Sequence, residues 1–280
     1  MKNKIAFLTT IFPIETIIID CFFESLKSQI YTSFDIIVVN DGYKNFNSIK
    51  VKYSDLNIIE LKYSNTPAKN REFGINFVKD SGYEIVVFGD CDDYFSPNRI
   101  QVAIEKLKIF DIVVNDLSLF NDKGIISSNY FSKRIENNTR IKSSYIKDKN
   151  IFGLSNTAIK LNIIDNVKFD KNLIALDWYL FSLLLMKGFS AVFTNESKSY
   201  YRQHLNNTIG LGIITRESIL NGISVKIKHY ELMKEESSIF DRLLSETYEL
   251  KNKVNDARYI DKLKDSSKMN LFWWEEIQNI

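Results

Sequence analysis

Few cysteines, histidines, prolines and glycines occur in this chain, and each shortage excludes a class of protein. Two cysteines and two histidines among 280 residues show no CxxC or Cys/His spacing, which argues against a disulfide framework or a structural zinc site. Three prolines and ten glycines predict no long flexible linker. Apart from the N-terminal segment, the longest apolar run is "WYLFSLLLM", whose nine residues are too few to span a membrane.

Charge and the N-terminal segment argue against two further classes. The 37 basic and 35 acidic residues leave a net charge of +2, which gives no reason to expect a nucleic-acid partner. The first twenty residues begin like a signal peptide, but Glu15 and Asp20 interrupt the apolar part and no small-residue cleavage site follows. We therefore expect a cytoplasmic protein without a transmembrane segment, and peripheral contact with the inner face of a membrane is left open.

Strand-like and helix-like segments alternate over the first hundred residues. The predicted strands are 4–10, 34–41, 56–63 and 83–90, and the predicted helices are 17–30 and 71–82. Short β-branched runs without polar alternation are typical of strands covered on both faces. The pattern therefore predicts an α/β fold with an open, mostly parallel sheet and flanking helices.

The remainder of the chain is less regular. It predicts a strand at 110–116, a hairpin around Gly124, helices at 138–149 and 176–188, and extended segments at 190–196 and 198–204. From about residue 213, apolar residues at three- and four-residue spacing predict helices with a junction near 234–238. We assign residues 1–212 to the α/β domain and residues 213–280 to a helical C-terminal extension.

In the stretch "YEIVVFGDCDDYFSP", four apolar residues predict a buried strand. The strand is followed by three carboxylates, Asp90, Asp92 and Asp93. Clustered carboxylates repel one another and resist burial without compensation, so they need open solvent or a partner. They could cap the following helix, include a phosphoacceptor, or hold a divalent cation. The third interpretation is favoured, because two carboxylates one residue apart can be aimed at one point and Mg²⁺ and Mn²⁺ prefer oxygen ligands completed by phosphate and water.

Four motifs occur in an order that resembles a known family. They are "IIVVNDG", "PAKNREFGINFVKDSGYEIVVFGDCDDYFSP", "LDWYLFSLLLMKGF" and "YYRQHLNNTIG". Together they resemble the nucleotide-sugar domain of family 2 glycosyltransferases with the GT-A fold, over residues 3–212. One difference is Glu72, which follows Arg71 where that family has an asparagine and is an unfavourable neighbour for a diphosphate unless it points away.

The resemblance implies a role for each matching residue. Asp41 would contact the base or ribose of the nucleotide, and Arg71 the nucleotide or its diphosphate. Asp90 would hold the ribose or assist the metal, and Asp92 would be the direct metal ligand. For the last two motifs, the resemblance implies Asp177 as general base, His204 as a further metal or diphosphate contact, and Arg202 beside it. Helix capping is the alternative for Asp177, and a satisfied polar side chain at a strand end is the alternative for His204.

The resemblance also implies an activity. It is inverting transfer of a sugar from a nucleotide-diphosphate donor, UDP-linked by expectation, to a hydroxyl of a glycan acceptor, with Mn²⁺ or Mg²⁺ as cofactor. Richness in Asn, Ile and Lys is typical of an AT-rich bacterial genome, which suggests a surface polysaccharide or lipooligosaccharide acceptor. A non-catalytic nucleotide-binding or scaffolding protein of a glycan-assembly complex is the alternative. A sugar nucleotidyltransferase, which resembles this fold, usually carries a glycine-rich, arginine-containing loop after its first strand. It is disfavoured because the corresponding stretch "TTIFPIET" has no glycine.

The C-terminal stretch "NLFWWEEIQNI" concentrates aromatic residues. Such residues suit a buried interface or a lipid headgroup region. Glu275 and Glu276 lie beside them without a basic cluster, so we favour packing or self-association, including a homodimer through the C-terminal helices, over membrane binding.

Overall fold

The computed structural model describes residues 4–203 and 215–266, and its contacts divide the chain into two compact units. The first unit comprises Met1–Lys142, Ile151–Asn172 and Gly188–Arg202. The second comprises Ser143–Asn150, Leu173–Lys187 and Gln203–Ile280. The predicted boundary between residues 212 and 213 lies outside the described residues, as does the aromatic C-terminal stretch.

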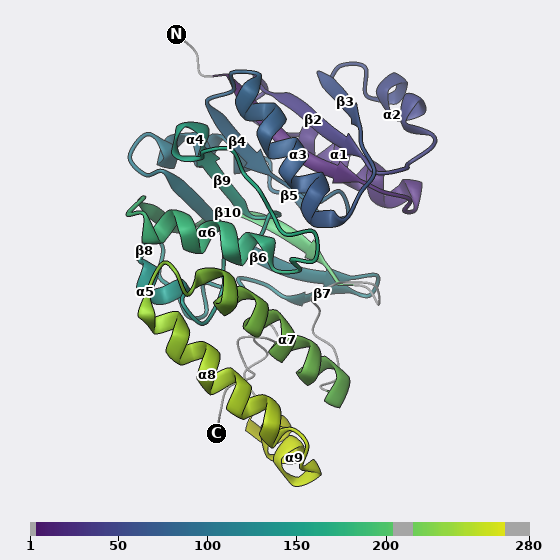
Figure 1. Cartoon of the computed structure of the whole chain (residues 1–280). Coiled ribbons are helices and arrows are strands. Elements are labelled where there is room, and N and C mark those ends of the chain that lie inside the picture. Colours follow the sequence, from purple (N-terminus) through teal and green to yellow (C-terminus); the bar gives the residue numbers. More distant parts are fainter. Residues whose placement is uncertain (1–3, 204–214, 267–280) are drawn as a thin grey trace. The chain divides into compact units, whose positions relative to one another are not determined.

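The described part of the first unit forms a ten-stranded sheet (Figure 1). Its order is β3-β2-β1-β4-β9-β6-β10-β5, with β7 paired to β6 and β8 paired to β10. The strands are β1 Ile5–Ile11, β2 Asp35–Asn40, β3 Ile58–Lys62, β4 Ile85–Phe88, β5 Tyr94–Phe95, β6 Ile112–Asn121, β7 Gly124–Ser127, β8 Arg140–Ile141, β9 Thr157–Lys160 and β10 Ala191–Arg202. Strands β1 to β4 pair in parallel with one another, as does β6 with β10, whereas β9 is antiparallel to both β4 and β6.

Helices cover both faces of this sheet (Figure 1). They are α1 Thr16–Lys27, α2 Phe46–Lys52, α3 Pro67–Asp80 and α4 Arg99–Leu107, with a 3₁₀ turn at Leu161–Ile163. Phe22 of α1 packs edge-on against Phe7 of β1, with ring centroids 5.8 Å apart. The next side chain of β1, Leu8, points to the opposite face, where Gly74 of α3 lies so close that a Cβ would come within 2.9 Å of it. The predicted α/β class, with a mostly parallel sheet and flanking helices, is confirmed.

The structure also tests the local predictions in the middle of the chain. The hairpin is confirmed, since Asn121 pairs with Gly124, which has a φ of +118°. The helix predicted at 138–149 is mostly wrong. Residues 140–141 form β8, paired with β10, and only Ser143–Ile146 is helical, as α5. Pairing with β10 overrides the local helical pattern here.

Helices make up the described part of the second unit. Besides α5 they are α6 Leu176–Met186, α7 Arg216–Met233, α8 Ser238–Lys253 and α9 Ala257–Ser266. Thr215 caps α7 in a reciprocal arrangement with Ser218, and α7 ends where the helix junction was predicted. Over residues 4–203 and 215–266, none of the helices has the length and apolar character needed to cross a membrane.

His229 of α7 is fully buried in the second unit. Its ring stacks on that of Trp178 of α6, with centroids 3.7 Å apart and planes 7° from parallel. Neither ring nitrogen has a hydrogen-bond partner among the described residues. Burial therefore lowers the pKa of His229 to about 3 and keeps the ring neutral.

This burial predicts a loss of stability in mild acid. An unfolded histidine binds a proton below about pH 6.5, whereas the buried ring does so only near pH 3, so the unfolded state binds more protons between these values. Lowering the pH from 7.5 to 5 should reduce the free energy of unfolding by about 2 kcal/mol through His229 alone. Urea unfolding at both pH values, followed by circular dichroism, measures this difference.

The matched variant is His229→Phe, which keeps an aromatic ring against Trp178 but cannot titrate. The free energy of unfolding of this variant should fall less between pH 7.5 and pH 5 than that of the wild type. Equal losses in both proteins would show that His229 is protonated in the folded state.

Candidate active site

Residues 90–93, called here the acidic turn, follow β4 at the carboxyl edge of the parallel strands. This is the edge at which open α/β sheets bind ligands. Gly89 leads into the turn, and a Cβ on it would lie 2.4 Å from the Phe7 ring and 2.7 Å from the Phe95 ring. The two aromatic rings therefore leave room only for glycine at this position.

Asp90 forms an ion pair with Arg71 of α3. The Asp90 side chain is 28% exposed and that of Arg71 is 14% exposed. Burial raises the pKa of Asp90 above its ordinary value, the Arg71 charge opposes this rise, and the charge of Asp92 adds to it. The sequence predicted both residues for the nucleotide site, and the structure brings them into contact.

Asp92 and Asp93 differ in their surroundings. Asp92 is half-buried, and its backbone carbonyl accepts a hydrogen bond of 2.9 Å from Nε of Arg202, at the end of β10. Asp93 is only 1% exposed, and its carboxylate accepts hydrogen bonds from the Ser155 hydroxyl and, at 2.8 Å, from the Arg202 N–H. Burial and the charges of Asp92 and Asp90 raise the pKa of Asp93 well above its usual range.

Helix α3 links two strand ends through adjacent residues. It begins after Thr66, whose hydroxyl accepts from the Lys69 N–H at 3.4 Å, with Pro67 at the first helical position. Asn70 then donates to the Asp41 carboxylate after β2 at 2.8 Å, while the next residue, Arg71, holds Asp90 after β4. One turn of α3 therefore orients both predicted nucleotide-binding carboxylates.

Glu72 does not contribute its charge to the Asp90 ion pair. Its carboxylate accepts hydrogen bonds from Lys69 at 2.7 Å and from the Phe169 N–H at 2.5 Å. Both contacts hold the Glu72 carboxylate, at the position where the family has an asparagine.

The structure rejects helix capping as the role of the acidic turn. The N-cap of α4 is Asn98, which makes no side-chain capping hydrogen bond, and neither Asp90, Asp92 nor Asp93 occupies that position. The acidic turn instead contacts α3, β10 and the segment before β9.

The structure does not test two further predicted site residues, Asp177 and His204. Asp177 belongs to the second unit, in the first turn of α6, where its carboxylate accepts from the Trp178 N–H at 2.8 Å. It is not the N-cap, which is Ala175. His204 lies outside the described residues.

The carboxylates of the acidic turn fit a divalent cation whose remaining ligands come from a bound phosphate. Among the described residues, no three His, Cys, Asp or Glu side chains converge as a metal site. Mg²⁺ is commonly held by one or two carboxylates together with substrate phosphates, so a full protein cage is not required. Burial, together with the neighbouring carboxylates, raises the pKa of Asp90 and of Asp93.

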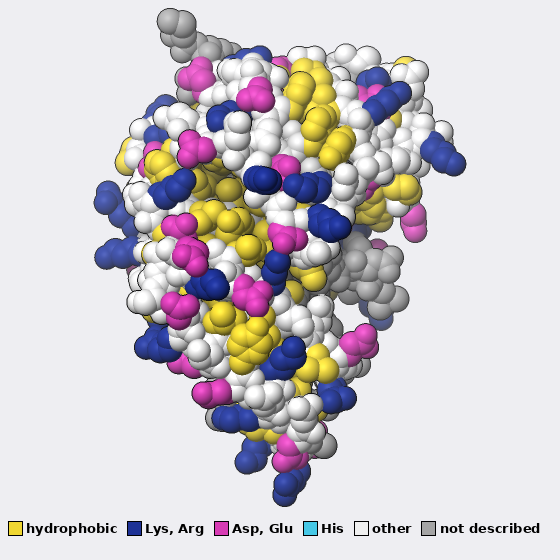
Figure 2. All heavy atoms as spheres, viewed as in Figure 1, with side chains coloured by type: hydrophobic (Ala, Val, Ile, Leu, Met, Phe, Trp, Pro, Cys, Tyr) yellow, Lys and Arg dark blue, Asp and Glu magenta, His cyan; other side chains and the backbone are white. Residues whose placement is uncertain are grey.

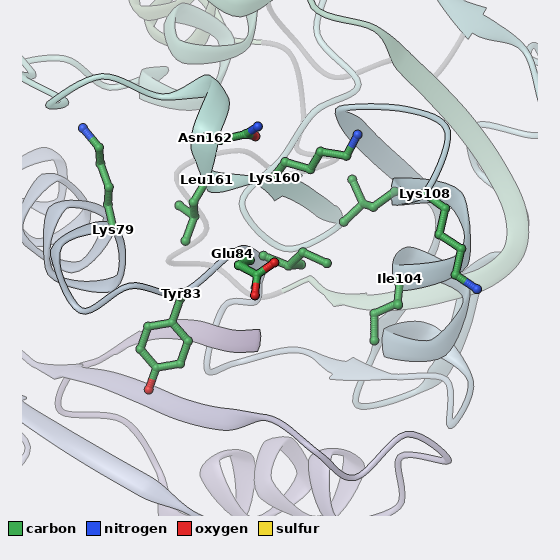
Figure 3. Close-up of a pocket in the computed structure, with 10 residues that line it drawn as sticks. Lys79, Tyr83, Glu84, Ile104, Lys108, Lys160, Leu161 and Asn162 are labelled. Atoms are coloured by element: carbon green, nitrogen blue, oxygen red, sulfur yellow. The ribbon is translucent and has the colours of Figure 1, made fainter. Parts of the chain in front are cut away.

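A surface pocket of about 460 Å³ lies at the opposite edge of the sheet (Figure 3). Tyr83, Glu84 and Ile85 line it where β4 begins, and Lys160 lines it where the antiparallel β9 ends. It contains no residue of the acidic turn, so we do not assign it to the predicted site. Basic and acidic side chains are interspersed on the face shown in Figure 2, in keeping with the net charge of +2.

Three polar residues around the site were not predicted from the sequence: Asn70, Ser155 and the buried Arg99. Asn70 lies in the second motif but was given no role, and Ser155 and Arg99 lie outside the four motifs. The one available signal was Arg99 itself, a charged residue that directly follows "SPN" and begins an otherwise apolar helix face.

The mostly parallel sheet with flanking helices is that of a GT-A type domain. A sequence model described as "Glycosyl transferase family 2" matches residues 18–159. The chain belongs to this family, which confirms the resemblance predicted from its motifs.

Two curated bacterial proteins are similar in sequence. Glycosyltransferase GlyA of Streptococcus pneumoniae is 22% identical over 72% of this chain, and the match spans 31% of GlyA. WfaP of Escherichia coli, a UDP-Glc:alpha-D-GlcNAc-diphosphoundecaprenol beta-1,3-glucosyltransferase, is 25% identical over 74% of this chain and 81% of its own length. The chain thus corresponds to less than a third of GlyA and to most of WfaP.

Solved structures show the same fold. TarS residues 1–349 of S. aureus superimpose with a TM-score of 0.61 at 16% identity, covering 91% of this chain and 73% of that one. Structures matched in the same way include TarS with UDP-GlcNAc and a mannosyltransferase of Pyrobaculum calidifontis with GDP-Man and Mn²⁺.

Proposed function

We propose that this chain transfers a sugar from a UDP-linked donor to a hydroxyl of a glycan acceptor, with inversion at the anomeric carbon. The observation that carries the proposal is the Arg71–Asp90 ion pair beside Asp92 at the carboxyl edge of the sheet. Family membership supports the reaction type, and the donor named for WfaP and the UDP-GlcNAc complex of TarS support the nucleotide. The bacterial relatives support a surface polysaccharide or lipooligosaccharide as acceptor.

The nucleotide would be held across the two strand ends that α3 links. Asp41 would accept hydrogen bonds from the base or ribose, and Asp90 from the ribose. Arg71 extends from α3 to Asp90, and its guanidinium would also face the diphosphate. Its Nη1 has no hydrogen-bond partner among the described residues. Arg202, whose side chain is 12% exposed, would add positive charge on the β10 side.

Asp92 would hold a divalent cation, Mn²⁺ or Mg²⁺, with Asp90 and His204 as further ligands. When bound, the cation neutralises charge that develops on the diphosphate leaving group. Arg71 and Arg202 would stabilise the same charge from two sides. Asp177 would accept the proton of the acceptor hydroxyl as it attacks the anomeric carbon.

Titration with nucleotides tests this function. Calorimetry with UDP, GDP and CMP, each with and without Mn²⁺, should show binding of UDP that tightens at least about tenfold with the metal. Incubation with UDP-glucose and UDP-GlcNAc should then release UDP with the donor that fits. Tighter binding of GDP would reassign the donor class. No binding of any nucleotide would contradict the proposed function and favour a scaffolding role.

A further inference from the structure

Five buried polar residues of the first unit are linked by hydrogen bonds into a network that ends in the acidic turn. Its members are Arg99 of α4, Asn115 of β6, Ser199 of β10, Ser155 before β9, and Asp93, and each is at most 5% exposed. We call it the Arg99–Asp93 network. It joins a buried cation to a buried anion by way of strands β6 and β10.

All its hydrogen bonds run in one direction. Nε of Arg99 donates to Oδ1 of Asn115 at 3.0 Å, and Nδ2 of Asn115 donates to the Ser199 hydroxyl at 3.2 Å. The Ser199 hydroxyl donates to the Ser155 carbonyl at 2.6 Å, which can only accept. The Ser155 hydroxyl donates to the Asp93 carboxylate. The hydrogen bonds that link the five residues therefore all point from Arg99 toward Asp93. Ser155 accepts through its backbone carbonyl and donates through its side-chain hydroxyl, so both its backbone and its side chain are held in place.

Arg99 is only 1% exposed, and within the described residues its guanidinium donates to neutral groups and not to a carboxylate. Its Nη2 donates to the Phe88 carbonyl, and its guanidinium lies 4.3 Å from the Phe95 ring centroid. Burial lowers the pKa of Arg99 to about 9, and the charges of Asp93 and Asp90 oppose the fall, so the side chain stays positive at neutral pH. A buried charge of this kind is stable only when an opposite charge compensates it.

The other end of the network holds the predicted metal site in place. Asp93 accepts from the Arg202 N–H, and Arg202 in turn donates from Nε to the Asp92 carbonyl. The end of β10 and the acidic turn are thus fastened together by two hydrogen bonds, one of them made by the terminal carboxylate of the network.

We propose that the Arg99–Asp93 network is a charge-compensated positioning device that fixes the acidic turn against the end of β10 and so sets where Asp92 faces a bound donor. It rests on the function proposed above, because it concerns the same site. Arg99 and Asp93 are positioning residues and touch no substrate.

A double-mutant cycle of Arg99→Met and Asp93→Asn tests the charge compensation. Each single change leaves the opposite charge buried with less compensation, and should lower the thermal unfolding midpoint by about 10 °C. The double variant should lose clearly less than the sum of the two, because both charges are then gone. Additive losses would overturn the proposal.

Asp111→Asn supplies the matched control for this cycle. Its carboxylate accepts from Ser190 and Lys160 and lies before β6, at the opposite end of that strand from the site. Combined with Arg99→Met, it should give additive losses. If Arg99→Met does not fold, a cycle of Ser155→Ala and Ser199→Ala replaces it, with the same expectation of a loss below the sum.

Calorimetry with UDP and Mn²⁺ tests the positioning role. The affinity for UDP in the presence of Mn²⁺ should fall at least about tenfold in Asp93→Asn and in Ser155→Ala, but stay within about twofold in Asp111→Asn. Unchanged affinity in Asp93→Asn would overturn the positioning role. Absence of UDP binding in the wild type would instead contradict the proposed function, and the unfolding midpoints would still decide whether the two charges compensate each other.

Discussion

Asp92→Ala is expected to abolish the metal-dependent part of nucleotide binding and to lower donor cleavage by about 10²–10³-fold. Within the acidic turn, Asp90 pairs with Arg71 and Asp93 accepts from Ser155, whereas Asp92 takes part in neither contact. The change therefore leaves both of these contacts in place. Because a cation at this position would neutralise the leaving diphosphate, its loss should act mainly on the charged transition state. UDP titration with and without Mn²⁺ and UDP release from the accepted donor measure the two effects.

The control for this prediction is Asp80→Ala, which removes an exposed carboxylate at the end of α3. This variant should retain both metal-dependent binding and cleavage. If the affinity of Asp92→Ala for UDP still rises with Mn²⁺, Asp92 is not a metal ligand.

Asp177→Asn should leave donor binding intact while UDP release falls by about two orders of magnitude or more. Asparagine keeps the size of the side chain and an oxygen that can accept from the Trp178 N–H, but it cannot take a proton. A role confined to the first turn of α6 would therefore be largely preserved, whereas a role as base would be lost.

Two further measurements separate these roles. The thermal midpoint should change little in Asp177→Asn, and Asp177→Ala should lower it more because the first-turn hydrogen bond is then removed. Near-normal UDP release by Asp177→Asn would exclude Asp177 as the base and leave it as a helix-terminal residue.

The sequence predicts the elements around the acidic turn well because their signals are local. A buried strand followed by "GDCDD" places the acidic turn, and the motif around Arg71 places α3, without knowledge of distant contacts. Each feature depends on residues within one strand–turn–helix segment, where hydrophobic periodicity and turn chemistry act directly. The Arg71–Asp90 pair follows from two such segments that parallel strands bring to one edge.

The parts that the sequence did not predict depend on long-range pairing. Residues 140–141 become strand β8 only because β10 lies beside them. Ser155 donates to Asp93, which lies 62 residues away in the sequence, and Ser199 reaches Asp93 only through Ser155. A serine in a loop or strand carries no local signal of such a role. Asp177 is the reverse case: a motif identified it, and its carboxylate accepts from the Trp178 N–H in the first turn of α6.

The bond between Asp93 and the Arg202 N–H joins residues 109 positions apart. Loop closure over such a distance is slow relative to the pairing of β1 with β2, so this contact should form late in folding. During synthesis the acidic turn leaves the ribosome well before the strand that fastens it. A nascent chain that stops short of β10 would therefore contain the first strands of the sheet but lack the contact that fastens the acidic turn. We expect UDP binding only after residue 202 has left the ribosome.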